Sequence, residues 1–260
     1  CDFMIDGHCH LEQQQDPAFF DPERVIAESK KQLNAVITIC TRPEDLERTE
    51  VLLSKHPEFV HASFGFHPYE VISHSEKEIE QYIEKIKAAK QQASAIGEIG
   101  LDFFLIKDPE QQKRCKDIFV QFIEFSKELK LPIVIHCRDA HHETIDILSN
   151  QDARQVVFHY FGAKDFTKQI MEEGWHVSLP VTVAMRKSFK DVLLEIQEDR
   201  LMVETDSPVK ISGEKLILPT DVRYVIERIA DEKKTSFQEV EKLTDQNTAD
   251  FFSLKLSAKD

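Results

Sequence analysis

The sequence predicts a (β/α)₈ barrel, formed as one domain over residues 1–260 with an extra C-terminal helix. Eight short β-rich runs alternate with longer amphipathic segments along the chain. Runs such as Ile133-Val134-Ile135 are apolar at consecutive positions, as parallel strands buried on both faces must be. Eight strand–helix units in 260 residues match the usual size of this barrel.

The predicted strands are short, and each ends before a segment with helical spacing. They are Met4–Ile5, Ala35–Cys40, Val60–Phe66, Ala95–Leu101, Pro132–Cys137, Val156–Phe161, His176–Leu179 and Leu201–Glu204. The predicted helices are Pro22–Leu33, Pro43–Lys55, Glu76–Gln92, Pro109–Leu129, Ala140–Ser149, Asp165–Glu173, Val183–Gln197 and Thr220–Asp231. A last helix follows a capping box at Ser236–Glu239. A doubly wound open sheet is the competing fold, but no Gly-x-Gly-x-x-Gly follows the first strand.

The charge balance restricts the kinds of partner. Forty-seven acidic and thirty-three basic residues give a net charge of −14, whereas a broad nucleic-acid-binding face is normally basic. A nucleic-acid substrate would therefore be held locally, by a metal and a few positive side chains. Few aromatic residues are expected near the site, which argues against extended nucleic-acid binding.

The cysteines and the hydropathy indicate a cytoplasmic protein. Five cysteines without a Cys-x-x-Cys pair read as reduced thiols, not as a disulfide framework. The sequence has no apolar run long enough to cross a membrane and no secretory signal. The expectation is a monomer without an obligate protein partner.

A histidine pair, His8 and His10, ends the first strand. Residues two apart in a strand share a face, about 7 Å apart, which suits two ligands of one metal ion. A single pair of this kind is more often structural. The barrel assignment supplies the test, because active-site residues gather at the C-terminal ends of the strands.

Further metal-capable residues do fall at predicted strand ends. They are His67, Glu98, His136, His159 and Asp206. Any one of them could be a hydrogen-bonded core residue, but several buried polar groups at one rim would each need a partner. A binuclear metal site accounts for them together. His56, His61, His74, His141, His142 and His176 lie elsewhere and are expected to be structural or exposed.

These motifs resemble the TatD family of metal-dependent hydrolases, within the amidohydrolase superfamily. The resemblance runs in order along the whole chain. It rests on Asp6–Leu11, Gly65–Pro68, Gly97–Asp102, Pro132–Arg138, His159–Phe161, Glu204–Pro208 and Asn247–Phe252. It implies a TIM barrel, one or two divalent metals, and deoxyribonuclease or related phosphodiesterase activity.

Carried over by position, the resemblance implies that His8, His10 and Asp206 hold one metal. Glu98 would bridge to a second metal, which His136 and His159 complete. A carboxylate can bridge two cations where an imidazole cannot. Asp206 would also be the general base. The catalytic residues are then Asp206 and Glu98, and the metals are Zn²⁺, Mn²⁺, Co²⁺, Fe²⁺ or Mg²⁺.

Three more rim residues are candidates for substrate binding. His67 and Arg138 are expected to contact a substrate phosphate, although Arg138 could instead pair with Asp139 or Glu143. Asp102 either binds substrate or orients a ligand, and orientation is favoured. Cys9 and Cys137 neighbour ligands in sequence, but strand alternation points them toward the helices.

The loop Val209–Pro219 departs from the family pattern, in which an Asn-rich, Pro-containing loop is common. It borders the expected substrate cleft, so DNA as substrate is less secure than the metals. The leading hypothesis is hydrolysis of DNA, from an end or in single-stranded form. The alternatives are hydrolysis of a small ester, amide, lactone or phosphate compound, and an inactive metal-binding barrel that acts through a partner.

Overall fold

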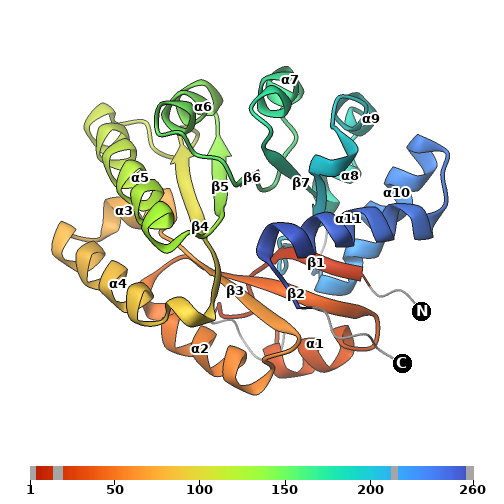
Figure 1. Cartoon of the computed structure of the whole chain (residues 1–260), viewed down its shortest axis with the longest axis horizontal. Coiled ribbons are helices and arrows are strands. Elements are labelled where there is room, and N and C mark those ends of the chain that lie inside the picture. Colours follow the sequence, from red (N-terminus) through yellow and green to blue (C-terminus); the bar gives the residue numbers. More distant parts are fainter. Residues whose placement is uncertain (1–3, 14–19, 212–215, 256–260) are drawn as a thin grey trace.

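Eight parallel strands form a barrel in sequence order, with helices around it (Figure 1). The computed structural model describes residues 4–13, 20–211 and 216–255. Each strand pairs with the next in parallel, and the predicted (β/α)₈ fold is confirmed. The strands are β1 (Met4–Cys9), β2 (Leu33–Cys40), β3 (Val60–Phe64), β4 (Ala93–Asp102), β5 (Ile133–Arg138), β6 (Val156–Phe158), β7 (His176–Pro180) and β8 (Leu201–Glu204).

The barrel closes between β1 and the residues that follow β8. The Asp206 N–H donates to the His8 carbonyl at 2.9 Å, and the His10 N–H donates to the Ser207 carbonyl at 2.6 Å. The fully buried Asp6 carboxyl also links β1 to the residues after β8. It accepts hydrogen bonds from the Thr205 N–H at 2.8 Å and from the Thr205 hydroxyl at 2.5 Å. Burial raises the pKa of Asp6 well above its usual value.

The helices agree with the sequence prediction, with two exceptions. They are α1 (Pro22–Ser29), α2 (Leu46–Lys55), α3 (Pro68–Ser73), α4 (Glu76–Ala88), α5 (Pro109–Leu129), α6 (His141–Asn150), α7 (Lys164–Glu172), α8 (Val181–Ala184), α9 (Phe189–Leu193), α10 (Val222–Lys233) and α11 (Phe237–Phe252). Single 3₁₀ turns precede α2 and α10 and follow α4.

One exception is the helix predicted over Val183–Gln197, which is wrong. Two short helices, α8 and α9, replace it, because residues 185–188 are all exposed and provide no side chain for the core-facing stripe. The other exception is α3, which the sequence analysis missed. At six residues it is too short to produce a helical period.

Helix α11 covers the N-terminal end of the barrel. The predicted capping box at Ser236 opens this helix, and Asn247 donates to the carbonyl of Leu201 at the start of β8. Phe251 and Phe252 pack inside the barrel against inward-facing strand residues that include Ile37. The C-terminal rim, where the metal-capable residues lie, is at the opposite end.

His176, at the start of β7, is half-buried against Phe251, with 5.0 Å between the ring centroids. Burial and the nearby charge of Arg200 lower its pKa to about 4. It is therefore neutral in the folded chain, whereas the unfolded chain takes up a proton below about pH 6.5. The free energy of unfolding should fall as the pH drops from about 6.5 to 4.

Replacing His176 with Gln should remove part of that acid sensitivity. The free energy of unfolding is measured by urea denaturation at pH 7.5, 6 and 5 and plotted against pH. The slope of this plot should be shallower in His176→Gln than in wild type, by at most about 1.4 kcal/mol per pH unit. His142→Gln, at an exposed histidine, is the control and should keep the wild-type slope. An unchanged slope in His176→Gln would contradict the assignment.

Candidate metal centre

The six predicted ligands converge at the C-terminal rim of the barrel. Each comes from the end of a strand or from the residues that follow it. His8 lies in β1, Glu98 in β4 and His136 in β5. His10 and His159 directly follow β1 and β6, and Asp206 is the second residue after β8. Strands far apart in the sequence thus bring four histidines and two carboxylates to one place.

Glu98 lies at the centre of this cluster, and its two oxygens face different histidines. Its Oε1 is 2.6 Å from His136 Nδ1 and 2.9 Å from His159 Nε2. Its Oε2 is 3.5 Å from His8 Nε2 and 3.9 Å from His10 Nε2. Burial alone would raise the pKa of Glu98, but the charge of His159 and hydrogen bonds from the histidines hold it well below its usual value. The carboxylate is therefore ionised, with one oxygen facing His136 and His159 and the other facing His8 and His10.

Asp206 faces the β1 histidines from the other side. Its Oδ1 is 3.4 Å from His10 Nε2 and 3.6 Å from His8 Nε2. Its backbone φ is 56°, in the left-handed region that Asp and Asn tolerate best among residues with a side chain. The Asp206 side chain is 17% exposed against 4% for Glu98, so Asp206 is the carboxylate that is more open to the cleft.

The donor set fits divalent cations. His8 is buried, and neither of its ring nitrogens has a hydrogen-bond partner among the described residues. Such orphaned buried groups are rare and call for an explanation. His8 Nε2 lies 3.5–3.6 Å from one oxygen of each carboxylate. Two ligand atoms that each lie about 2.1 Å from one tetrahedral ion are roughly 3.4 Å apart. The spacing of His8 Nε2 from the two carboxylate oxygens is close to this value and suits a shared cation.

Three further carboxylates lie behind the histidines and hold their rings. Glu12 Oε1 is 3.2 Å from His10 Nδ1, and Asp102 Oδ2 is 3.0 Å from His136 Nε2. The third carboxylate is Glu204, whose Oε1 is 3.4 Å from the Nδ1 of His159. Carboxylates in such positions orient metal-binding imidazoles.

The same carboxylates are fixed in turn by other groups. The Thr38 hydroxyl donates to Glu12 at 2.5 Å, and the Leu105 N–H donates to Asp102 at 2.8 Å. Asp102 therefore contacts a predicted ligand, as the orienting interpretation requires. The sequence analysis missed Glu12 and Glu204. A sequence signal was available for both: Glu12 lies two residues after His10, and Glu204 lies two residues before Asp206. Residues two apart in an extended segment share a face, so each glutamate could be expected on the side of the site.

Two glycines allow the strand that carries Glu98 to approach its neighbours. A Cβ on Gly65 would lie 2.3 Å from the carbonyl carbon of Gly97 and 2.6 Å from the backbone nitrogen of Glu98. A Cβ on Gly100 would lie 2.0 Å from the carbonyl oxygen of His136. Any side chain at either position would move the backbone that places a proposed ligand.

His67 is held as a hydrogen-bond donor toward the cluster. Its Nδ1 accepts the Tyr69 N–H at 3.1 Å, and burial lowers its pKa to about 4. A neutral imidazole that accepts at Nδ1 carries its proton on Nε2. That Nε2 lies 3.8 Å from Glu98 Oε1, so the donor points to the centre of the site.

Arg138 lies flat on an aromatic ring at the rim. Its guanidinium carbon is 3.7 Å from the centroid of Phe104. In the part of the chain that the structure describes, Arg138 forms no ion pair with Asp139 or Glu143, the alternative partners. Its guanidinium borders the same cleft as the metal cluster.

Two thiols and two histidines that the sequence analysis left out of the metal site form other contacts, whereas His141, also left out, lines the cleft. Cys9 is buried and donates to the Ile37 carbonyl, and Cys137 contacts the Thr144 hydroxyl, so both thiols pack against the barrel wall. His56 and His74 form ion pairs with surface carboxylates. Neither pair of residues takes part in the cluster.

The cluster opens into a cleft of about 930 Å³. Its lining includes Tyr69, Leu105, Arg186 and Val209. Val209 is the first residue of the loop that departs from the family pattern, and residues 212–215 of that loop lie outside the described residues. This volume is at the upper end of the range for ligand sites.

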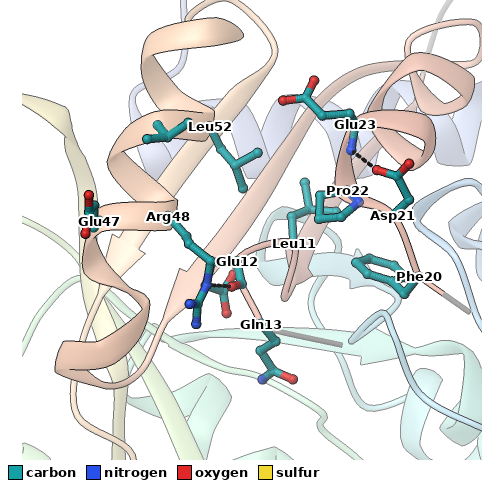
Figure 2. A pocket seen from close by; sticks show the side chains of 11 residues that line it. Leu11, Glu12, Gln13, Phe20, Asp21, Pro22, Glu23, Glu47, Arg48 and Leu52 are labelled. Atoms are coloured by element: carbon teal, nitrogen blue, oxygen red, sulfur yellow. Dashed lines mark hydrogen bonds between the residues drawn. The ribbon is translucent and has the colours of Figure 1, made fainter. Parts of the chain in front are cut away.

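A second pocket of about 400 Å³ lies between α1 and α2 (Figure 2). Leu11, Phe20 and Leu52 give it an apolar wall, and Arg48 donates to the Glu12 carbonyl at 2.8 Å. Gln13 and Phe20, which line this pocket, stand in the sequence on either side of residues 14–19, which lie outside the described residues.

A (β/α)₈ barrel with a cluster of histidines and carboxylates at its C-terminal rim is typical of metal-dependent hydrolases, and we assign the protein to this class. Comparison with known proteins identifies the family. The family model described as TatD related DNase matches residues 5–253, and the chain belongs to this family.

The relatives and the solved structures agree with this assignment. The uncharacterized metal-dependent hydrolase YabD of Bacillus subtilis is 32% identical over 96% of this chain and 99% of its own length. Human deoxyribonuclease TATDN3 is 27% identical over 96% of this chain and 94% of its own length. The crystal structure of YJJV, a TatD homolog from Escherichia coli, superposes with a TM-score of 0.86 at 23% identity, covering 98% of this chain and 99% of that one.

The protein is thus a metal-dependent hydrolase of the TatD family. No helix in the described residues is long and apolar enough to cross a membrane.

Proposed function

We propose that the protein hydrolyses phosphodiester bonds of DNA, from an end or in single-stranded form, with two divalent metal ions. The observation that carries the proposal is Glu98, whose two carboxylate oxygens face separate groups of histidines. A bridging carboxylate of this kind is what two nearby cations require.

In this proposal, His8, His10 and Asp206 would hold one ion, His136 and His159 would hold the other, and Glu98 would offer one carboxylate oxygen to each. A mixed set of imidazoles and carboxylates suits Zn²⁺, Mn²⁺, Co²⁺ or Fe²⁺, whereas Mg²⁺ prefers oxygen ligands. When bound, such ions neutralise phosphate charge and lower the pKa of water at the site.

The protein side chains then divide the remaining work. Asp206 accepts the proton of the attacking water. Burial alone would raise the pKa of this carboxyl, but the hydrogen bond from His10 and the charges of His10, His8 and His159 together lower it, so the carboxyl is ionised at neutral pH. His67 donates its Nε2–H to a phosphate oxygen. Arg138, held on Phe104, offers a guanidinium to a phosphate.

A phosphate substrate accounts for more of the cleft than a small ester or amide does. Ten arginines occur in the sequence, and six of them pair with carboxylates. In the described part of the chain, Arg138 and Arg186 have no such partner, and both line the cleft. An uncharged substrate would leave both cations unused.

The test begins with protein stripped by a chelator and reloaded with Mg²⁺, Mn²⁺, Co²⁺ or Zn²⁺. The expected result is cleavage of end-labelled single-stranded DNA with at least one metal and none in the stripped protein. Double-stranded DNA, p-nitrophenyl acetate and an aryl amide are offered in parallel. Turnover of the ester or amide without DNA cleavage under any metal would contradict the proposal.

A further inference from the structure

We propose that the wall of the cleft between β3 and β5 is a nucleobase subsite, formed by Tyr69, Leu105 and the stacked pair Phe104–Arg138. The inference rests on the proposed function and deepens it. It specifies that the phosphodiester carries a flat aromatic base on this side of the bond that is cut, which separates a nucleic acid from other phosphodiesters.

The first support is the exposure of apolar side chains. Tyr69 is 53% exposed, Leu105 52% and Phe104 48%, and they are three of the seven large hydrophobic side chains exposed in the described residues. Tyr69 and Leu105 line the metal cleft directly. Exposed apolar groups gathered beside a polar catalytic site mark the place of an apolar part of the ligand.

These side chains correct the expectation that the rim has few stacking residues. The sequence analysis missed Tyr69 as a rim residue because Tyr69 belongs to α3, which was too short to be predicted. Phe104 belongs to the connection between β4 and α5, whose path over the rim a sequence pattern does not determine. Both residues lie in segments that follow a strand at the catalytic end of the barrel, Tyr69 in α3 and Phe104 in the connection after β4.

The second support is the link between Tyr69 and the phosphate-binding groups. The Tyr69 N–H donates to His67 Nδ1 at 3.1 Å, and His67 Nε2 lies 3.8 Å from Glu98 Oε1. One hydrogen bond thus ties the residue with the exposed ring to the proposed phosphate donor. A nucleotide has its base next to its phosphate in the same way.

The third support is charge. Arg138 lies 3.7 Å from the Phe104 centroid and has no carboxylate partner in the described part of this acidic chain. Stacking on Phe104 fixes the guanidinium plane, so that its N–H groups remain available to a phosphate next to the base. Aromatic and cationic groups side by side are typical of sites for single-stranded nucleic acid.

The test compares Tyr69→Ala with Tyr69→Phe on a single-stranded oligonucleotide. Loss of one base-stacking partner should raise KM about tenfold in Tyr69→Ala. The kcat should stay within about twofold, since Tyr69 touches no reacting atom. Tyr69→Phe keeps the ring and should behave as wild type. Tyr224→Ala, at an exposed tyrosine of α10 that does not line the cleft, is the matched control.

A second substrate separates base stacking from a structural role. The same strand with one abasic residue is cleaved, and every product is resolved on a gel. Wild-type protein should lose cleavage at one of the two bonds beside the abasic residue, and Tyr69→Ala should match wild type at that bond. Equal KM values for wild type and Tyr69→Ala on the normal strand would overturn the subsite. It would also be overturned if Tyr69→Ala cleaved the abasic strand less than wild type does by the same factor as on the normal strand.

Binding of a fluorescein-labelled strand to the Mn²⁺-reloaded protein is measured by anisotropy in parallel. Absence of cleavage together with tenfold weaker binding by Tyr69→Ala would reject the proposed hydrolysis and support the subsite. Cleavage without any dependence on Tyr69 would support the hydrolysis and reject the subsite. If the protein does not cleave the strand, and its binding does not depend on Tyr69, both the proposed hydrolysis and the subsite are rejected.

Discussion

Replacing Asp206 with asparagine is expected to lower kcat on single-stranded DNA by about 10²–10⁴-fold. Asparagine keeps an oxygen that can face the metal, but it cannot take the proton of the attacking water. The substitution also suits the backbone, because φ at this position is 56° and Asn tolerates that region as Asp does. Alanine would add backbone strain to the chemical change.

The measurement pairs steady-state kinetics with metal content by mass spectrometry. Asp206→Asn should keep the wild-type circular dichroism spectrum and most of its metal, while kcat falls. Glu70→Asn, at a carboxylate that lines the cleft but is not one of the six proposed ligands, is the matched control. A normal kcat in Asp206→Asn would remove this residue as the general base.

Replacing Glu98 with glutamine should abolish detectable DNA cleavage and reduce the metal content from two ions to one or none. Glutamine has the same size, but its amide has one oxygen and no charge. It therefore cannot serve both groups of histidines that the two oxygens of Glu98 face. The loss of a bridging anion leaves the two cations unshielded from each other.

Stability provides a second measurement for Glu98→Gln. Metal that binds only the folded chain stabilises it, by about 4 kcal/mol when the free metal is a thousandfold above its Kd. Reloading should raise the Tm of wild type and of Glu70→Gln, and raise that of Glu98→Gln much less. Two ions per chain in Glu98→Gln would refute the bridging role.

Much of the fold could be predicted because every strand and most helices have their own sequence signal. Ile133-Val134-Ile135 indicates a buried strand without knowledge of its neighbours, and the Ser236 capping box marks a helix start by itself. The helix over Val183–Gln197 was predicted wrongly, because the exposed turn at 185–188 interrupts a pattern that is apolar on both sides.

The candidate ligands could be found because a barrel places every strand end at one rim. His8 and Asp206 needed only that rule and the family resemblance. The strand-end rule did not select Glu12 or Glu204. Glu12 lies two residues after His10, which it contacts, whereas the contact of Glu204 with His159 joins β8 to the end of β6 and depends on the folded chain. Arg138 was predicted from its place at the end of β5, but its contact with Phe104 could not be, because Phe104 belongs to the connection after β4.

The closure of the barrel also determines when the metal centre can form during synthesis. Asp6 and Thr205 are joined across 199 positions of sequence, and the residues on either side of this joint include His8, His10 and Asp206. A nascent chain that has not yet released β8 from the ribosome leaves β1 as an unpaired sheet edge and lacks Asp206. In the proposed site, metal would therefore load only after β8 has docked, and bound metal would report that the last strand is in place.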